Sequence, residues 1–211
     1  MKPLPLRAAA LGALFIAGTL AAPAAGEKEP RRVAADPVRE AIRIDGVLDE
    51  KTWTTLMADE TRAASGWFSI PHPGKPSFDR RAAFFAWDKE FLYVALKVEP
   101  GDEATLAAPE FTGDDTVRID LKGAALGIAR SGEQIQSIML PFLIPIRAAA
   151  RETEEGWVAE MAIPWAQLDV TPQAGEAIVF NIAGSDLSGD ISWAPARDHR
   201  DVKAFGRLEL R

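Results

Sequence analysis

The chain has 211 residues and no cysteine, and its 31 Asp and Glu residues outnumber its 24 Lys and Arg residues, for a formal charge of −7 at pH 7. This excess of negative charge argues against nucleic acid as a partner, because an acidic surface repels polyphosphates. The lack of cysteine excludes disulfides and thiolate metal sites, so the fold has to be held by a hydrophobic core. The length suits one domain.

The first residues have the layout of a cleaved export signal. Lys2 and Arg7 precede an apolar run over residues 8–22, and small residues follow as far as Ala25. We predict that residues 1–25 are a signal peptide, which makes the protein periplasmic or secreted. The alternative is a retained membrane anchor, since the run is not far below the ~20 residues that span a bilayer. The small residues at its end favour cleavage, and no later segment has the length and apolarity to span a membrane.

The next segment, residues 26–39, is charged and lacks apolar periodicity, so we predict a flexible tether before a domain over residues 40–211. Near the start of that domain, Asp49 is expected to cap a short helical turn. This turn would place Trp53 and Leu56 on one face.

Four later runs alternate apolar and polar residues, which is the period of half-buried strands. They cover residues 91–98, 117–122, 157–163 and 178–182. In each run the apolar residues are expected to point into a core and their neighbours to face water. Many short strands with little helix predict an all-β protein, an antiparallel β-sandwich of the jelly-roll or immunoglobulin-like kind with one or two short helical turns.

Three connections complete this prediction. Asp88–Glu90 and Glu154–Gly156 suit tight turns between strands, and Trp165–Leu168 suits a second helical turn opened by Pro164. Residues 137–149 are apolar on both faces and are interrupted by two prolines, so they fit either an edge strand or a loop over the core.

Six fragments, in this order, resemble carbohydrate-binding module family 9 and the wider DOMON-like sandwich superfamily. They are IDGVLDEKTW (44–53), WDKEFLYVALKV (87–98), DDTVRIDL (114–121), GWVAEMAIPW (156–165), FNIAGSD (180–186) and FGRLEL (205–210). The resemblance spans residues 40–211 and implies a non-catalytic domain that binds a glycan or a glycan end. It also implies a turn at Asp45 and Gly46, and a Trp53 that closes one end of the core.

In that family a sugar is held between two aromatic rings and bonded by carboxylate and amide groups. The ring positions correspond to Thr112, with Phe111 beside it, and to His199; the carboxylate corresponds to Arg118, and the amides to Ala183 and about Ala196. All five residue types differ from those of the family. We therefore expect a site of changed chemistry, in which Phe111 and His199 stack on the ligand while Arg118 bonds hydroxyls or a uronate carboxylate.

Two tryptophans extend the predicted carbohydrate-binding set, which is Phe111, Thr112, Arg118, Trp193, His199 and Trp67. Trp67 lies in a segment rich in glycine and proline, where stacking on a ligand competes with covering a core edge. Trp193 is expected either to line the site or to close the sandwich.

The resemblance leaves further readings open. No cofactor is required for glycan binding, although a structural calcium ion is a family feature that Asp45, Asp49, Asp186 and Asp190 could serve; ordinary turn chemistry explains the same aspartates.

A second reading is a carrier of haem b or another small molecule on the same sandwich, with Met139 and His199 as ligands. A third is a protein-interaction scaffold that has lost the sugar site. An enzyme is not expected, because the chain has no nucleophile elbow and no histidine spacing for catalytic zinc. Expected partners are a glycan and a separate carbohydrate-active enzyme or an envelope protein.

Overall fold

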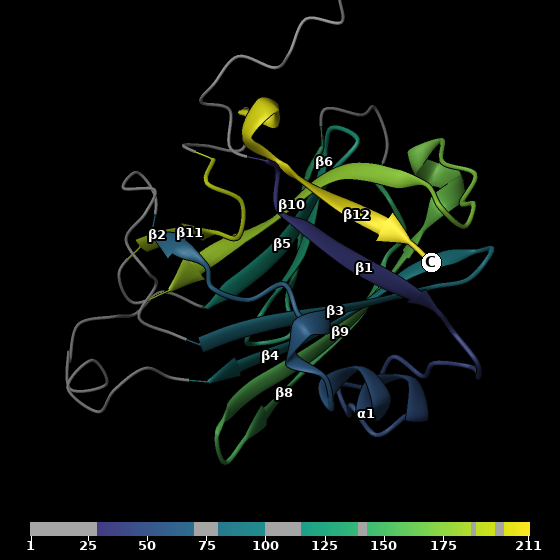
Figure 1. Ribbon diagram of the computed structural model, residues 1–211. Helices are drawn as coiled ribbons and strands as arrows, with labels where there is room; N and C mark the ends of the chain where they lie inside the picture. The colour runs from purple at the N-terminus through teal and green to yellow at the C-terminus, as the bar shows by residue number, and fades with distance from the viewer. Residues whose placement is uncertain (1–28, 70–79, 100–114, 139–142, 187–188, 197–200) are drawn as a thin grey trace, which may run out of the picture.

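The computed structural model describes residues 29–69, 80–99, 115–138, 143–186, 189–196 and 201–211. In this part of the chain two β layers pack face to face (Figure 1), so the predicted all-β sandwich is confirmed. One layer contains β7 (Gln134–Ile138), β6 (Ala124–Ala129), β5 (Thr116–Leu121), β10 (Ala177–Asp186) and β12 (Gly206–Leu210). The other contains β3 (Arg80–Trp87), β4 (Phe91–Glu99), β9 (Gly156–Pro164) and β8 (Arg147–Thr153).

The two layers are one continuous hydrogen-bonded sheet that folds back on itself, in the order β7-β6-β5-β10-β12-β1-β3-β4-β9-β8. The fold-back occurs at β1 (Arg32–Pro37), which runs parallel to β12 with its first residues and parallel to β3 with its last. The other pairs in this path are antiparallel. Two short strands, β11 (Gly189–Ser192) and β2 (Phe68–Ser69), extend the first layer from β10.

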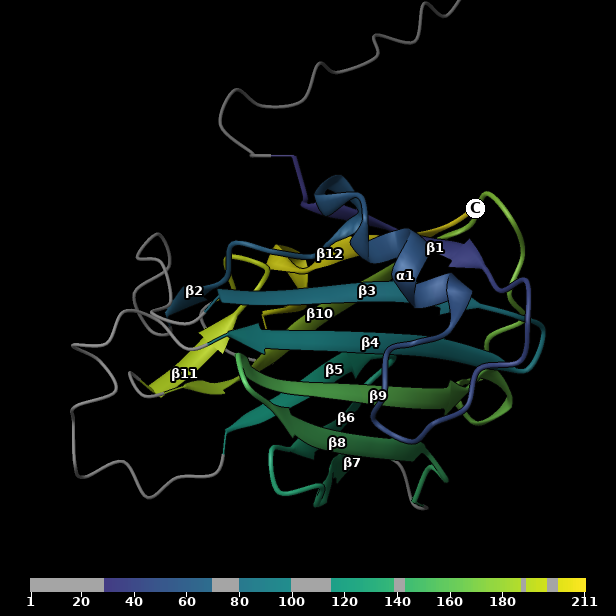
Figure 2. The same cartoon turned by 90° about the horizontal axis from the view of Figure 1, so that it is seen from below.

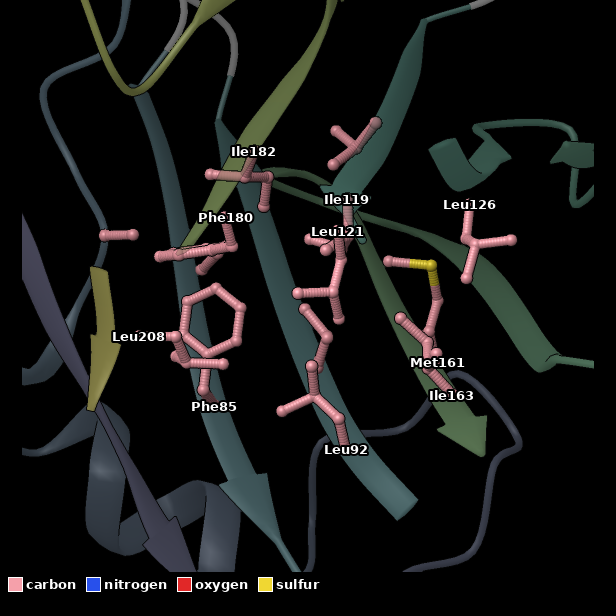
Figure 3. Close-up of a cluster of buried hydrophobic side chains, with 14 of the residues drawn as sticks. Phe85, Leu92, Ile119, Leu121, Leu126, Met161, Ile163, Phe180, Ile182 and Leu208 are labelled. Carbon is pink, nitrogen blue, oxygen red and sulfur yellow. The ribbon is translucent and has the colours of Figure 1, made fainter. Parts of the chain in front are cut away.

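The main core lies between the layers, where each strand contributes its inward residues. Figure 3 shows Leu92 of β4 and Ile119 of β5 among them. Phe85 and Phe180, from opposite layers, meet edge to face with their ring centroids 5.3 Å apart. Burying one such side chain contributes ~1.5–3 kcal/mol. The alternation in the four runs thus predicts correctly which residues enter the core.

The outward residues of β4 and β9 differ from the prediction, because many of them are buried as well, as are those of the adjacent β3. Helix α1 (Lys51–Met57) and the segment before it cover this face (Figure 2). Trp53 and Leu56 pack there against Tyr93 of β4, which the alternation places in water. Trp53 therefore fills a second, outer cluster and does not close the end of the main core.

Residues 32–37 correct the predicted tether, because they form β1 at the centre of the sheet. Only Val33 and Ala35 of this strand are buried, and both are small, so the period of two is hard to detect in the sequence. The charged neighbours have partners on adjacent elements: Arg32 pairs with Glu209, and Asp36 with Arg62. The folded domain therefore begins before residue 40.

Two predictions concern short helical elements, and one of them is wrong while the other is confirmed. The α1 helix begins after Glu50, which makes no side-chain capping bond, so the cap predicted at Asp49 is wrong. The turn at Trp165–Leu168 is confirmed as a 3₁₀ helix, η2, that follows Pro164. Two further 3₁₀ turns are η1 (Glu60–Arg62) and η3 (Val202–Ala204).

The connections between strands agree with the predictions. In the turn after β3 the Asp88 carboxylate accepts hydrogen bonds from the backbone N–H groups of Glu90 and Phe91, 2.8 Å each. The ambiguous stretch 137–149 begins with the end of β7 and ends with the start of β8. Between them, Ile144 and Ile146 are buried in or beside the core, while Leu143 is exposed. The stretch is thus part strand and part core-covering connection where it is described.

Glu160 of β9 fixes the N-terminal segment to the sandwich. Its side chain is fully buried under α1, at 0 % exposure. One carboxylate oxygen accepts the Trp53 indole N–H at 2.8 Å, and the other accepts the backbone N–H groups of Asp45 and Gly46 at 3.1 and 2.9 Å. The turn and the tryptophan of the first fragment therefore converge on one acid, whose pKa burial raises and these hydrogen bonds lower, with a net increase.

This raised pKa sets the direction of a pH dependence. A carboxyl group with a higher pKa in the folded state stabilises the fold fully below its unfolded pKa, near 4.5, and loses that contribution as the pH rises through the folded value. We expect the wild type to gain stability relative to the Glu160→Gln variant as the pH falls from 7 to 4.5. Urea unfolding over this range measures the difference, and a difference that stays flat or shrinks would contradict the assignment.

Candidate functional site

The outward-facing residues of β5 and β10 form a mainly polar face on the side of the sandwich away from α1, on which Thr116, Arg118 and Ser185 are partly exposed while Asp120, Asn181 and Ala183 are buried. Cross-strand pairs place Arg118 opposite Ala183, Asp120 opposite Asn181, and Thr116 opposite Ser185. We call these six residues the β5–β10 face. The two positions that the family resemblance gives to a sugar-bonding carboxylate and amide, residues 118 and 183, are thus direct neighbours in the register.

Arg118 has the longest side chain of this face. Its Nε donates a hydrogen bond to Asp120 Oδ1 at 3.1 Å, and the two charges form an ion pair. The arginine side chain is 29 % exposed, whereas that of Asp120 is nearly buried. On β6, the cross-strand neighbour of Arg118 is Gly127, where an added Cβ would lie 2.8 Å from the Arg118 Cβ. The guanidinium is therefore oriented by Asp120 and flanked by small residues on both neighbouring strands.

Asn181 organises the border of the face toward β11. Its amide nitrogen donates to Ser192 Oγ at 2.8 Å, and its carbonyl oxygen accepts the backbone N–H of Ala194 at 3.0 Å. These bonds hold the chain after β11 beside β10, and buried Ala196 lies in that stretch. Asn181 was not among the predicted site residues; the available signal was an amide in the outward phase of a strand, between two apolar residues.

A buried ion pair ties the two layers together beside this face. Arg81 of β3 reaches across the sandwich, and its Nη2 donates to Asp115 Oδ1 at 2.8 Å and to the Ser185 carbonyl at 2.7 Å. Its Nη1 donates to the Thr116 carbonyl at 3.3 Å, and Trp157 Nε1 of β9 donates to Asp115 Oδ2, also at 3.3 Å. Arg81 therefore holds the paired ends of β5 and β10, two residues from Arg118.

The two tryptophans of the predicted binding set are core residues in this fold. Trp193 is 2 % exposed and packs on Phe180, with Arg31 over its ring. Trp67 is 3 % exposed, and its indole N–H donates to the Ala64 carbonyl at 3.0 Å. Neither ring presents a face to a ligand, so the stacking role predicted for them does not fit this arrangement. For both, the alternative of covering or closing the core agrees with their burial.

The predicted stacking residues Phe111 and His199, together with Thr112, lie outside the described residues. So does Met139, the other predicted haem ligand. Among the described residues, Met161 is buried in the main core and packs against apolar neighbours. The haem reading therefore stays a prediction that gains no support from the described part of the chain.

The aspartates predicted for calcium do not converge on a cation. Asp45 and Asp49 both pair with Arg43, which lies between them, and Asp45 Oδ1 also accepts the Val47 N–H at 3.0 Å in a local turn. A calcium ion there would have to displace the arginine. Asp190 is exposed near the tip of the β10–β11 hairpin, and the side chain of Asp186 is outside the described set. The described residues contain no cluster of three or more potential metal ligands.

Two solved structures resemble this fold. One is a carbohydrate-binding module of family 9 from Caldicellulosiruptor kristjanssonii in complex with cellotriose, with a TM-score of 0.60 and 13 % sequence identity, covering 86 % of this chain and 94 % of the other. The second is a family 9 module from the same organism in complex with glucose, with a TM-score of 0.57 and 14 % identity, covering 86 % and 96 %. At this identity the likeness establishes a shared fold.

Comparisons by sequence add no assignment, since no protein-family model and no curated protein matches the chain. Within the described residues, no helix has the length and apolarity needed to cross a bilayer.

Proposed function

We propose that this protein is an exported, non-catalytic domain that binds a glycan or a glycan end on the β5–β10 face. The observation that carries the proposal is the pairing of Arg118 with Ala183, because it joins two positions that the resemblance assigns to sugar contacts. The shared fold with two modules whose structures were solved in complex with sugars supports it. The basic start and apolar run of residues 1–25 support export.

The chemistry of the face suits a polyhydroxylated ligand. Sugars need planar polar groups for their hydroxyls and a flat surface for their C–H faces. Arg118 offers donors from a partly exposed side chain, and its cross-strand neighbours Ala183 and Gly127 are small. Rings for stacking would come from Phe111 and His199, as the resemblance suggests.

A glycan array with residues 26–211, run with and without calcium, tests this function. We expect saturable binding that the Phe111→Ala and His199→Ala variants each weaken by roughly two- to tenfold, since a stacking contact is worth ~0.5–1.5 kcal/mol. A visible spectrum of the same sample checks the haem reading. A protein that melts cooperatively, is colourless and binds no glycan would contradict the proposal and point to protein partners instead.

A further inference from the structure

We infer that the ligand of the β5–β10 face is an acidic sugar, whose carboxylate binds the outer edge of the Arg118 guanidinium. This inference rests on the proposed glycan-binding function and specifies its ligand class. The glycan would carry a uronate at the bound residue, as in polymers of glucuronic or galacturonic acid.

Arg118 is oriented by a hydrogen bond from its Nε to Asp120. A guanidinium has five N–H donors in a fixed fork, and Asp120 takes only the one on Nε, at 3.1 Å. Among the residues that the structure describes, none accepts a hydrogen bond from either Nη of Arg118. The pair of Nη donors is the edge that matches the two oxygens of a carboxylate in bidentate geometry. Asp120 thus leaves the carboxylate-binding edge available.

The cross-strand neighbours of Arg118 are both small. Arg118 stands between Gly127 on β6 and Ala183 on β10, so neither cross-strand neighbour has a side chain long enough to cover it. A Cβ at residue 127 would lie 2.3 Å from the Val117 carbonyl oxygen, so this position admits no larger residue without a backbone shift. The strand pairing itself therefore places small, buried residues, and no long side chain, directly beside the partly exposed guanidinium.

This contact has to outweigh the net negative charge of the whole protein. Acidic residues exceed basic ones, which disfavours an anionic ligand at long range. The Debye length at physiological ionic strength is ~8 Å, so remote surface acids are largely screened while a contact with Arg118 is not. Asp120 offsets part of the arginine charge, but it does so from the Nε side. The local geometry therefore decides in favour of a carboxylate.

Matched sugar pairs test the inference with the domain of residues 26–211. Oligosaccharides of galacturonic acid are compared with the corresponding galactose oligosaccharides, and those of glucuronic acid with glucose, by isothermal titration calorimetry at two salt concentrations. We expect at least one uronate to bind roughly tenfold or more tightly than its neutral counterpart, with an affinity that falls as salt rises.

Variants locate the contact. Arg118→Gln should remove the preference for the uronate, and Arg118→Lys should recover only part of it, because lysine keeps the charge and loses the fork. Arg130→Gln is the matched control, since Arg130 is an exposed arginine that pairs with Glu152. Because glutamine and lysine both keep an N–H donor for the nearly buried Asp120, and the side chain of residue 118 is partly exposed, we expect these variants to fold, which their melting curves will show.

The outcomes separate the two proposals. Equal or tighter binding of the neutral sugars would overturn the acidic-sugar inference and leave glycan binding intact. Uronate binding that Arg118→Gln does not change would also overturn the inference, because the carboxylate would then be bound elsewhere. Binding of neither class here and none on the glycan array would overturn both.

Discussion

Replacing Glu160 by alanine is expected to lower the free energy of unfolding by about 3–5 kcal/mol, because each buried donor left without a partner costs ~1–3 kcal/mol. Three donors lose their acceptor in this variant: the Trp53 indole and the backbone N–H groups of Asp45 and Gly46. Chemical denaturation measures the change, and near-ultraviolet circular dichroism reports the loosening of Trp53.

Glu154→Ala is the matched control, since this exposed glutamate lies in the turn before the same strand and its loss should change stability by no more than ~0.5 kcal/mol. If Glu160→Ala proved as stable as this control, Glu160 would not be what holds the N-terminal segment on the sheet. Because the cluster lies under α1, away from the β5–β10 face, glycan affinity should be unchanged in any Glu160 variant that remains folded.

Replacing Arg81 by methionine is expected to cost about 3 kcal/mol of stability, because it leaves the Asp115 carboxylate without its cation in a largely buried site. It should also weaken glycan binding, since Arg81 holds the carbonyls of Thr116 and Ser185 at the ends of the two strands that carry the proposed site. The double variant Arg81→Met/Asp115→Asn should recover part of the stability, and a double-mutant cycle isolates the pair.

Arg80→Met is the control for this prediction. Arg80 is the adjacent residue of β3, but its side chain is 84 % exposed and lies 4.0 Å from Glu99. Exposed ion pairs contribute ~0–1 kcal/mol, so this variant should resemble the wild type in both stability and binding. Similar losses in Arg80→Met and Arg81→Met would show that the buried ion pair has no special role.

The sandwich was predictable from sequence because its core strands follow a clear period of two. In β4 the inward residues Leu92, Val94 and Leu96 are large and apolar, and the turn before them has an aspartate that bonds to the backbone. The ordered fragments then identified one known architecture. Local pattern, turn chemistry and global fold agree here, which is the condition under which sequence reasoning succeeds.

The errors in the fold prediction have physical causes, and the main one is that the burial of a residue depends on elements distant in sequence. Tyr93 of β4 lies in the outward phase, and only the packing of α1 over it removes it from water. For β1 the cause is different, because its buried residues Val33 and Ala35 are too small to indicate a central strand. The structural role of Glu160 could not be predicted, because the three N–H groups that donate to it lie in a segment more than 100 residues away in the sequence.

The candidate site was predictable only in part. The resemblance matched residues 118 and 183, which the register brings together. The supporting residues Asp120, Asn181 and Arg81 were missed, because a polar residue in a strand carries no sign of whether its partner is water or another side chain. For Trp67 and Trp193, burial depends on the packing of neighbouring elements, so the choice between core and ligand contact needed the structure.

The most direct test of the central claim is a nuclear magnetic resonance titration of the isotope-labelled domain with the glycan that binds most tightly on the array. We predict that the amide signals that shift are those of β5 and β10 around Arg118 and Ala183, while those around Glu160 under α1 stay in place. Shifts confined to the α1 side, or no saturable shift with any glycan, would contradict the assignment of the β5–β10 face as a glycan-binding site.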